Sequence, residues 1–435
     1  MTATLVISIF TTICLIGAIV FVPEIRIGKR SYETFWMVAV LGMAMLLIFG
    51  KVTFPEILAN ITASNSINPL KILVLFLSMT VLSVILDELG FFRKLAYLAL
   101  KKANGKQLRI FLYLYITVSI LTIFTSNDII ILTFTPFICY FSKNAKINPL
   151  PYLISEFVAA NTWSMMLVIG NPTNIYLASA YEIHFLTYFQ VMFFPTVISS
   201  LVAFGLLLLL FRKELTKQII ITESYEYELK DKPIVGIILA HLIICTILLA
   251  VSSYIGLEMW YICLSFCLSA LLWLGGYELL KKRQKPLILK ASLKKSPWSL
   301  VPFILSMFVF VMALNKFGIT AIISRDLSAL NPVFGFGLSS FLTANIINNI
   351  PMTILYSNIL ETVVPVFQMP AIYASVIGSN IGAYLTPIGA LAGIMWMQIL
   401  KKQGVKLSFP KFIEYGMLIS VPTILVALLT LLMEF

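Results

Sequence analysis

The sequence predicts an all-α integral membrane protein with about 10 to 12 transmembrane helices in two inverted-topology repeats, with re-entrant hairpins and broken helices. Three observations lead to this prediction. The 435-residue chain is 60% hydrophobic and only 11% charged, its apolar runs recur from end to end, and one stretch of its first half reappears in its second half. A helix needs about 20 apolar residues to cross a ~30 Å hydrocarbon core, and its backbone polar groups must be paired within the segment.

The apolar runs are expected to form helices because they are long and do not alternate as barrel strands do. Spans are expected near 3–22, 33–50, 70–89, 108–123, 150–169, 185–211, 234–253, 256–276, 298–315, 330–346, 369–381 and 412–433. Shorter, interrupted segments lie near 124–141, 170–180, 347–366 and 386–399. The segment from Lys94 to Leu108 is amphipathic, so we expect it to lie at the membrane interface.

The charged residues predict the orientation of these spans. Basic residues cluster at 26–30, 93–109, 281–295 and 401–411, and the mixed-charge loop near 212–233 is placed on the same side. Because short basic loops mark the cytoplasmic side, both termini are expected outside a bacterial inner membrane. The net charge of +12 is therefore assigned to these loops and not to nucleic-acid binding. The first apolar run lacks a basic leader, so it is expected to be a retained span.

An internal repeat is the most informative feature of the chain. The stretch LVLFLSMTVLSVILDELGFF begins at Leu73, and VPFILSMFVFVMALNKFGIT begins at Val301. The first copy runs into a basic cluster and the second starts just after one, so the copies are expected to cross in opposite directions. Inverted repeats of this kind are a recurring plan of secondary transporters. The matching positions share one offset of 228 (306 − 78, 307 − 79 and 318 − 90): Ser78 with Ser306, Met79 with Met307, and Gly90 with Gly318.

The repeat suggests a division of the chain into four parts. Residues 1–69 hold N-terminal spans, and residues 70–211 hold the first repeat with a hairpin near 124–141. Residues 212–297 hold cytoplasmic loops and linking spans. Residues 298–435 hold the second repeat with a hairpin near 340–366.

Four polar breaks interrupt the apolar sequence, two in each half. Gly and Pro interrupt a helix and free backbone groups, while Asn, Ser and Thr supply neutral oxygens and donors. A half-helix N-terminus suits an anion, and freed carbonyls suit Na⁺ or H₃O⁺. Paired breaks in corresponding places therefore predict a substrate and ion site. Its candidate residues are Ser126, Asn127 and Asp128; Asn161, Gly170, Asn171, Pro172, Thr173 and Asn174; Asn348, Asn349 and Pro351; and Gly378, Ser379, Asn380, Thr386, Pro387 and Gly389.

Asp128 is the most informative single residue, because it lies in otherwise apolar sequence. A carboxylate at membrane depth is costly and is by default a proton carrier or cation ligand; the alternative is a structural cap. Glu156 lies near the start of a span and either reaches the interface or joins the site. Asp87 and Glu88 are expected to form cytoplasmic salt bridges. His241 lies in the middle of a span, and a packing role is favoured there over a role as a proton relay.

The remaining residue types argue against an enzyme and against a resident metal. No nucleophile and base pair, phosphate loop or metal-spaced cluster of His and Cys is found in the sequence. The five cysteines show no disulfide framework. Cys263 and Cys267 share a helix face and could bind a soft metalloid, although apolar packing is the favoured interpretation. We expect no cofactor apart from a bound Na⁺ ion as one option.

Several motifs resemble the ion-transporter superfamily, and most nearly its arsenical pump membrane proteins, the arsenite permeases. The NhaD-type sodium/proton antiporters and the citrate and divalent-anion symporters are related families. The resemblance covers nearly the whole chain, most clearly from about residue 70 onward. The motifs are LDELGFF at 86–92, SNDIIILTFTP at 126–136, NNIP at 348–351, ASVIGSNIGAYLTPIGALAGIMW at 374–396 and LKKQGVKLS at 400–408.

The resemblance implies two re-entrant hairpins whose tips meet near the membrane middle. Residues 126–128 would form the first tip, and Asn348 with Asn349 the second. Residues 170–174 and 386–389 would be the partner unwound helices. Arsenite permeases are thought to expel As(OH)₃ or its antimony analogue against protons, sometimes with an attached ATPase.

The expected function is proton-coupled efflux of arsenite, antimonite or a related oxyanion. Acidic residues stand in the arsenite permeases where this chain has Asn161 and Asn380, so the alternative is a Na⁺- or H⁺-coupled transporter of a small anion such as a di- or tricarboxylate. An ion channel is an alternative of another class, but a channel needs a continuous polar pore. The expected partners are the lipid bilayer, the solute and its coupling ion, with a homodimer and an ATPase subunit as further options.

Overall fold

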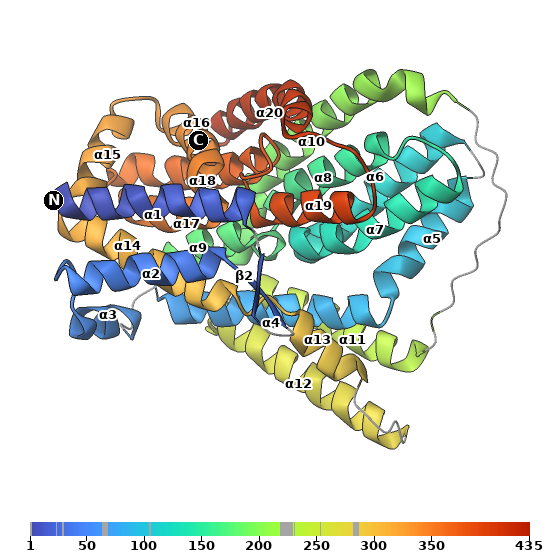
Figure 1. The fold of residues 1–435 in the computed structure, drawn as a ribbon, viewed down its shortest axis with the longest axis horizontal. Helices are drawn as coiled ribbons and strands as arrows, with labels where there is room; N and C mark the ends of the chain where they lie inside the picture. The colour runs from blue at the N-terminus through green and yellow to red at the C-terminus, as the bar shows by residue number, and fades with distance from the viewer. Residues whose placement is uncertain are drawn as a thin grey trace.

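The computed structural model describes residues 2–22, 24–27, 30–62, 68–103, 106–217, 229, 231–252, 254–281 and 287–435. Most described residues lie in helices, and many of these helices run along the long axis of the molecule (Figure 1). Within the described part, eight helices are long and apolar enough to cross a membrane, and two shorter apolar helices accompany them. The predicted fold class is therefore confirmed. Lys29, residues 282–286 and most of the loop predicted at 212–233 fall outside the described residues.

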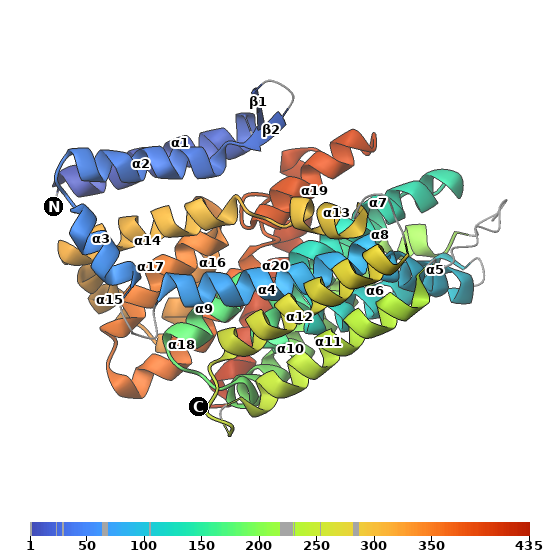
Figure 2. The same cartoon turned by 90° about the horizontal axis from the view of Figure 1, so that it is seen from below.

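The N-terminal part has three helices, α1 (Thr2–Phe21), α2 (Phe35–Ile48) and the short α3 (Phe54–Ile61). The first two form a pair beside the rest of the bundle (Figure 2). Strands β1 (Glu24–Ile27) and β2 (Arg30–Glu33) join α1 to α2 as an antiparallel pair that the sequence did not predict. A Cβ atom at Gly42 would lie 2.4 Å from Thr11 and 2.6 Å from Phe310, so glycine permits the close contact of α1, α2 and α14.

The first repeat begins with one long apolar helix and one short amphipathic helix. These are α4 (Pro69–Glu88) and α5 (Phe91–Ala103). Two hairpin arms follow, α6 (Gln107–Phe124) and α7 (Asn127–Asn144). A broken helix comes next, built from α8 (Leu150–Trp163), the 3₁₀ turns η1 (Ser164–Met166) and η2 (Val168–Gly170), and α9 (Pro172–Ala180). The repeat ends with α10 (Phe185–Leu215).

The linking part and the second repeat follow in the same order. The linking helices are α11 (Lys232–Val251), α12 (Met259–Leu280) and α13 (Leu287–Lys295). The second repeat has α14 (Leu300–Lys316), α15 (Ile319–Ser328), the hairpin arms α16 (Pro332–Ile347) and α17 (Asn349–Glu361), and the broken helix α18 (Pro365–Gly382) with α19 (Leu391–Lys402). It ends with α20 (Phe409–Leu432). The element order of the first repeat thus recurs step by step.

The two repeats run in opposite directions. In both views, α4 leads toward α5 at one end of the bundle, and α14 leads toward α15 at the other (Figures 1 and 2). Lys295, just before α14, forms ion pairs with Asp87 and, at 3.1 Å, with Glu88, which ends α4. The end of one repeat helix therefore lies beside the start of its counterpart. The predicted salt-bridging role of these two acids is confirmed.

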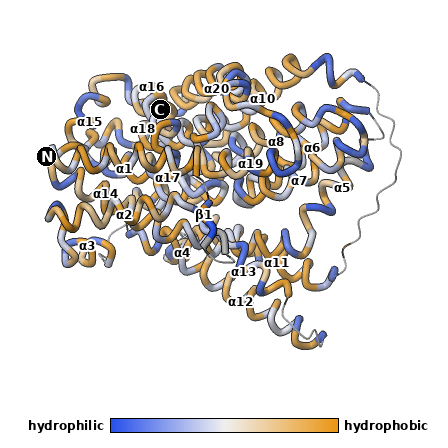
Figure 3. Tube along the Cα trace, in the orientation of Figure 1, coloured by the Kyte–Doolittle hydropathy of each residue, from blue (hydrophilic) through white to orange (hydrophobic). Residues whose placement is uncertain are grey.

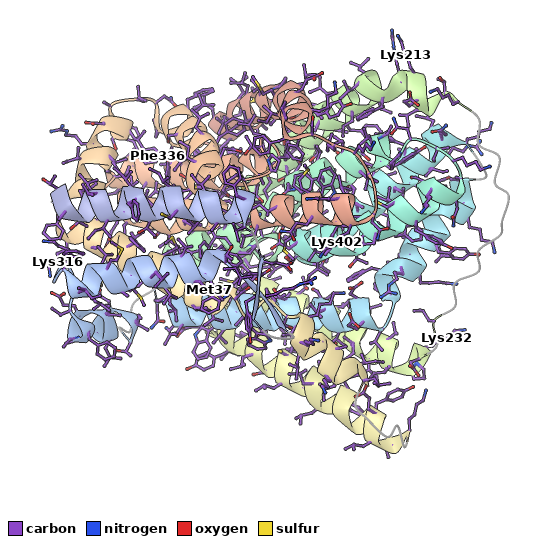
Figure 4. The ribbon with its side chains drawn as sticks, in the orientation of Figure 1. Met37, Lys213, Lys232, Lys316, Phe336 and Lys402 are labelled. Carbon is purple, nitrogen blue, oxygen red and sulfur yellow. The ribbon has the colours of Figure 1, made fainter. Side chains whose placement is uncertain are left out.

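The surface of the bundle suits a lipid environment. Hydrophobic residues cover most of the length of the helices, and hydrophilic residues gather toward the ends (Figure 3). The outward side chains of α12 include Leu272 and Trp273, which are 77% and 56% exposed. Lys213 and Lys232 lie at the end toward which α4 leads, and Lys316 lies at the opposite end (Figure 4).

Candidate functional site

The first hairpin turns at two polar residues, Thr125 and Ser126. Thr125 is extended (φ −137°, ψ −177°), and Ser126 is the N-cap residue of α7. Asn127 is 1% exposed and donates its amide N–H to Asn161 Oδ1 at 3.0 Å. Within the described residues, the buried Ser126 Oγ and Asn127 Oδ1 have no hydrogen-bond partner. Because an unsatisfied buried polar group is costly, these two atoms point to a ligand at this tip.

Asp128 lies next to these two groups, in the first turn of α7. Its side chain is half-buried, and the described part of the chain shows no hydrogen bond or ion pair to its carboxylate. The partial positive charge of the helix N-terminus favours a carboxylate here. A structural cap would bond to the first amides of the helix, and no side-chain cap bond is found at the start of α7. The structure therefore gives no support to the cap alternative.

The first broken helix unwinds later than the sequence suggested. Asn161 lies inside α8 and donates to Phe157 O at 2.8 Å, so it bonds to its own helix instead of interrupting it. The unwound segment runs from Ser164 to Asn171. A Cβ atom at Gly170 would lie 2.1 Å from Ser164 O, which requires glycine. Asn171 then caps α9 by accepting from the Thr173 amide at 3.2 Å, with Pro172 as the first helical residue.

The second hairpin turns at Asn348, which adopts φ 75° and ψ 153°. Such a conformation is nearly confined to glycine and costs on the order of 1–3 kcal/mol elsewhere. Asn348 is held there by two bonds, accepting from the Ile350 amide at 3.3 Å and donating to Ile388 O at 3.0 Å. The Asn349 amide donates to Gly389 O at 3.1 Å. The second tip is therefore docked onto the unwound segment between α18 and α19.

That unwound segment, residues 383–390, is held in place by Asn345, which was not among the predicted site residues. Its Oδ1 accepts from the Thr386 amide at 3.0 Å and from Thr386 Oγ1 at 2.7 Å. Its Nδ2 donates to Gly382 O at 3.0 Å. A Cβ atom at Gly389 would lie 2.5 Å from Gly382 O, so glycine is required beside Pro387. One asparagine of α16 thus joins the end of α18 to the middle of the break.

A cluster of buried amides joins the two repeats. Asn380 of α18 is fully buried, and its Oδ1 accepts from Ser164 Oγ and from Asn171 Nδ2, each at 2.9 Å. Its Nδ2 donates to Asn174 Oδ1 at 2.7 Å. Ser379 Oγ donates to Thr173 Oγ1 at 3.0 Å beside it. We call the following residues the amide cluster: Asn127, Asn161, Ser164, Asn171, Asn174 and Asn380.

These contacts correct the predicted position of the fourth break. Ser379 and Asn380 were placed at an interruption, but they lie inside α18, where Asn380 also donates to Val376 O at 2.8 Å. Beside them, a Cβ atom at Gly378 would lie 1.9 Å from Ser340 Oγ and 2.4 Å from Gly337 O. Gly378 therefore permits close packing of α16 on α18. Pro351 is buried in the first turn of α17.

Other titratable residues have structural roles or lie apart from the amide cluster. Glu156 is 1% exposed, and Thr135 Oγ1 lies 3.0 Å from its carboxylate, so it does not reach an interface. His241 contacts Ile237 O at 2.8 Å and Ser269 Oγ at 3.0 Å, in agreement with a packing role. In the described part of the chain, no group of three or more His, Cys, Asp or Glu side chains could hold a metal ion. Cys263 and Cys267 are free and buried.

The chain is similar to known transporters over most of its length. The family model CitMHS, described as citrate transporter, matches residues 33–378. An arsenical pump membrane protein of Escherichia coli strain K12 is 28% identical over 82% of this chain and 84% of its own length. A putative arsenical pump membrane protein of Bacillus subtilis strain 168 is 25% identical over 90% and 92% of the two chains.

The fold is similar to that of a solved transporter. The crystal structure of the Alcanivorax borkumensis YdaH transporter, described as having an unusual topology, gives a TM-score of 0.58 at 12% identity. The match covers 98% of this chain and 97% of that one. At this low identity the likeness concerns the fold.

Proposed function

Because the chain belongs to the CitMHS citrate transporter family, we propose that it is an ion-coupled secondary transporter that exports arsenite, antimonite or a related oxyanion in exchange for protons. The family membership makes it a membrane transporter. The solute, the coupling ion and the direction are parts of the proposal. Curated relatives named arsenical pump membrane proteins support the choice of solute.

One observation carries the proposal: an unpaired carboxylate lies beside unpaired polar atoms at a buried hairpin tip. Ser126 Oγ and Asn127 Oδ1 are buried without hydrogen-bond partners within the described residues. The half-buried Asp128 carboxylate follows them in the chain, and no hydrogen bond or ion pair to it is found in the same part of the chain. A solute with several hydroxyl groups can donate to Asn127 Oδ1 and exchange bonds with Ser126 Oγ. The first tip is therefore the place where we put the solute.

Asp128 supplies the coupling in this proposal. A carboxylate at membrane depth is unfavourable unless it is protonated or paired. A proton and the solute compete for the same carboxylate, so binding of one releases the other. The carrier switches between its inward-facing and outward-facing states with the proton or the solute bound, but not with a bare carboxylate. Transport is therefore an exchange of solute for protons.

The arrangement of the repeats supports alternating access rather than a channel. Each hairpin docks on a broken helix of its own repeat, through Asn127 with Asn161 and through Asn348 with Ile388. Asn380 then links the two broken helices and is fully buried. A channel requires a continuous polar pore. We place the basic end of the bundle in the cytoplasm, which puts both termini outside.

A second candidate is uptake or exchange of a small carboxylate coupled to Na⁺ or H⁺. The observation that favours it is the neutrality of the amide cluster, whose members Asn161 and Asn380 carry no charge that would repel an anion. The description of the family as citrate transporter agrees with this candidate. A bound Na⁺ would then have carbonyl and amide oxygens of the breaks as ligands.

Transport into everted membrane vesicles separates the two candidates. The first predicts accumulation of arsenite driven by an imposed pH gradient and unaffected by a Na⁺ gradient. The second predicts Na⁺- or H⁺-driven movement of a di- or tricarboxylate without arsenite flux. Vesicles with an Asp128→Asn variant at equal membrane abundance serve as the control for coupling. Arsenite flux that is independent of the imposed pH gradient would exclude the first candidate.

A further inference from the structure

A cavity of about 760 Å³ lies outside the amide cluster, between the end of α1, α19 and the loop that leads to α20. Its inner wall includes Pro387 and Ile388 of the unwound segment. Its outer wall includes Lys401 and Lys406, which belong to the basic cluster at 401–411. The cavity therefore joins the basic end of the bundle to the unwound segment between α18 and α19.

The lining residues of α19 show how far this cavity extends along the bundle. They run from Ile394 to Lys401, a rise of about 10 Å at 1.5 Å per residue. That distance is about a third of a ~30 Å hydrocarbon core. Ile394, Gln398 and Lys401 line the cavity from one face of α19, as their spacing of four and three residues requires. At the inner end, Ile388 O accepts from Asn348 at the tip of the second hairpin at 3.0 Å.

The polar groups of the cavity wall are positive or neutral. Lys401 and Lys406 are both exposed, and no Asp or Glu is among the residues that line the cavity. Gln398 is half-buried on the same wall, and no hydrogen bond to its side chain is found in the described part of the chain. A low-dielectric cleft lined by one sign of charge raises the local concentration of the opposite charge.

We propose that this cavity is a water-filled entrance through which small anions, in preference to cations, pass between the basic end of the bundle and the tip of the second hairpin. Lys401 and Lys406 set the charge preference at the mouth, and Gln398 offers a neutral polar contact halfway. The role of the entrance in transport rests on the proposed function. Its water content and its electric potential do not, and these are what the experiment measures.

The test uses single cysteines placed in the cavity and thiol reagents that cannot cross membranes. Gln398→Cys and Ile394→Cys are labelled in everted and in right-side-out vesicles, each with a negatively and a positively charged methanethiosulfonate of similar size. Ala329→Cys, exposed at the opposite end between α15 and α16, is the matched control. The native chain, with its five cysteines, measures the background.

Both cavity cysteines are expected to react in everted vesicles and Ala329→Cys in right-side-out vesicles. The ratio of anionic to cationic labelling rates should be higher at position 398 than at 329. It should fall about fivefold when Lys401 and Lys406 are both changed to Gln, the order expected for two unit charges acting through water within a Debye length. Each of these results supports the proposal.

Two outcomes would overturn it. Cavity cysteines that react only with a membrane-soluble maleimide would mean that lipid fills the space. An unchanged labelling ratio after removal of both lysines would exclude the charge preference. Failure of arsenite or carboxylate transport in the same vesicles would refute the proposed solutes and leave the labelling results intact, so the two failures are distinguishable.

Discussion

Replacement of Asn380 by Ala tests the amide cluster most severely, because this side chain bonds to three partners across the two repeats. Its Oδ1 accepts from Ser164 and Asn171, and its Nδ2 donates to Asn174, over distances of 2.7–2.9 Å. Alanine removes all three bonds. Ser164 Oγ can still donate to Asn161 O at 2.9 Å, but the side-chain N–H of Asn171 has no other acceptor among the described residues.

The expected loss of stability follows from these contacts. Hydrogen bonds between membrane helices contribute on average about 0.6 kcal/mol each, so three contribute roughly 2 kcal/mol. Leaving the side-chain N–H of Asn171 buried without a partner adds about 1 kcal/mol to this loss of stability. We therefore expect Asn380→Ala to lower the free energy of unfolding by about 3 kcal/mol, and transport to be lost with it.

The measurement is reversible unfolding in mixed micelles, followed by the fluorescence of the six tryptophans during titration with SDS. Asn358→Ala is the matched control. The side-chain N–H groups of Asn358 bond within α17, to Ile354 O at 3.3 Å and to Ser357 Oγ at 3.4 Å. That control should change stability by less than about 0.5 kcal/mol. If Asn380→Ala falls in the same range, the amide cluster does not join the repeats as described.

Other predictions concern coupling, the breaks and pH. Asp128→Asn should abolish pH-driven flux while membrane insertion, measured by protease protection, is unchanged; near-normal flux would remove Asp128 from the mechanism. Pro172→Ala and Pro387→Ala should each lower transport more than tenfold, whereas Pro55→Ala, at the exposed start of α3, should not; equal effects would count against the paired breaks. Burial raises the pKa of Glu33 in the folded protein above its usual value. Protonation of Glu33 therefore stabilises the fold fully at a pH below its pKa in the unfolded chain, and this stabilisation is lost as pH rises through its pKa in the folded protein. Glu33→Gln should therefore flatten the fall in stability as pH rises above the usual pKa of glutamate, about 4.3, and an unchanged slope in thermal melts would refute that assignment.

The helices and their inverted order could be predicted from the sequence, because apolar runs and basic loops report directly on a bilayer. The expected span near 70–89 is α4, at Pro69–Glu88, and the expected segment near 170–180 is α9, at Pro172–Ala180. The β1–β2 pair was missed because it is short and lies beside a basic cluster whose charges dominated the interpretation.

The location of the breaks was harder to predict. Asn161 and Asn380 look like helix breakers in sequence, yet each satisfies its amide on a carbonyl four residues earlier and leaves the helix intact. Their cross-repeat partners could not be inferred, since Ser164 and Asn380 are 216 positions apart. Asn345 was passed over because an asparagine before the NNIP motif gives no sign of the Thr386 amide that it binds.

The most direct test of the central claim is the position of a bound solute relative to the hairpin tips. Antimony scatters X-rays anomalously, so crystals grown with antimonite would locate it without assumptions about the chemistry of the site. We expect one anomalous peak within hydrogen-bonding distance of Ser126, Asn127 and Asp128. A peak beside Cys263 and Cys267, with none at the first hairpin tip, would contradict it.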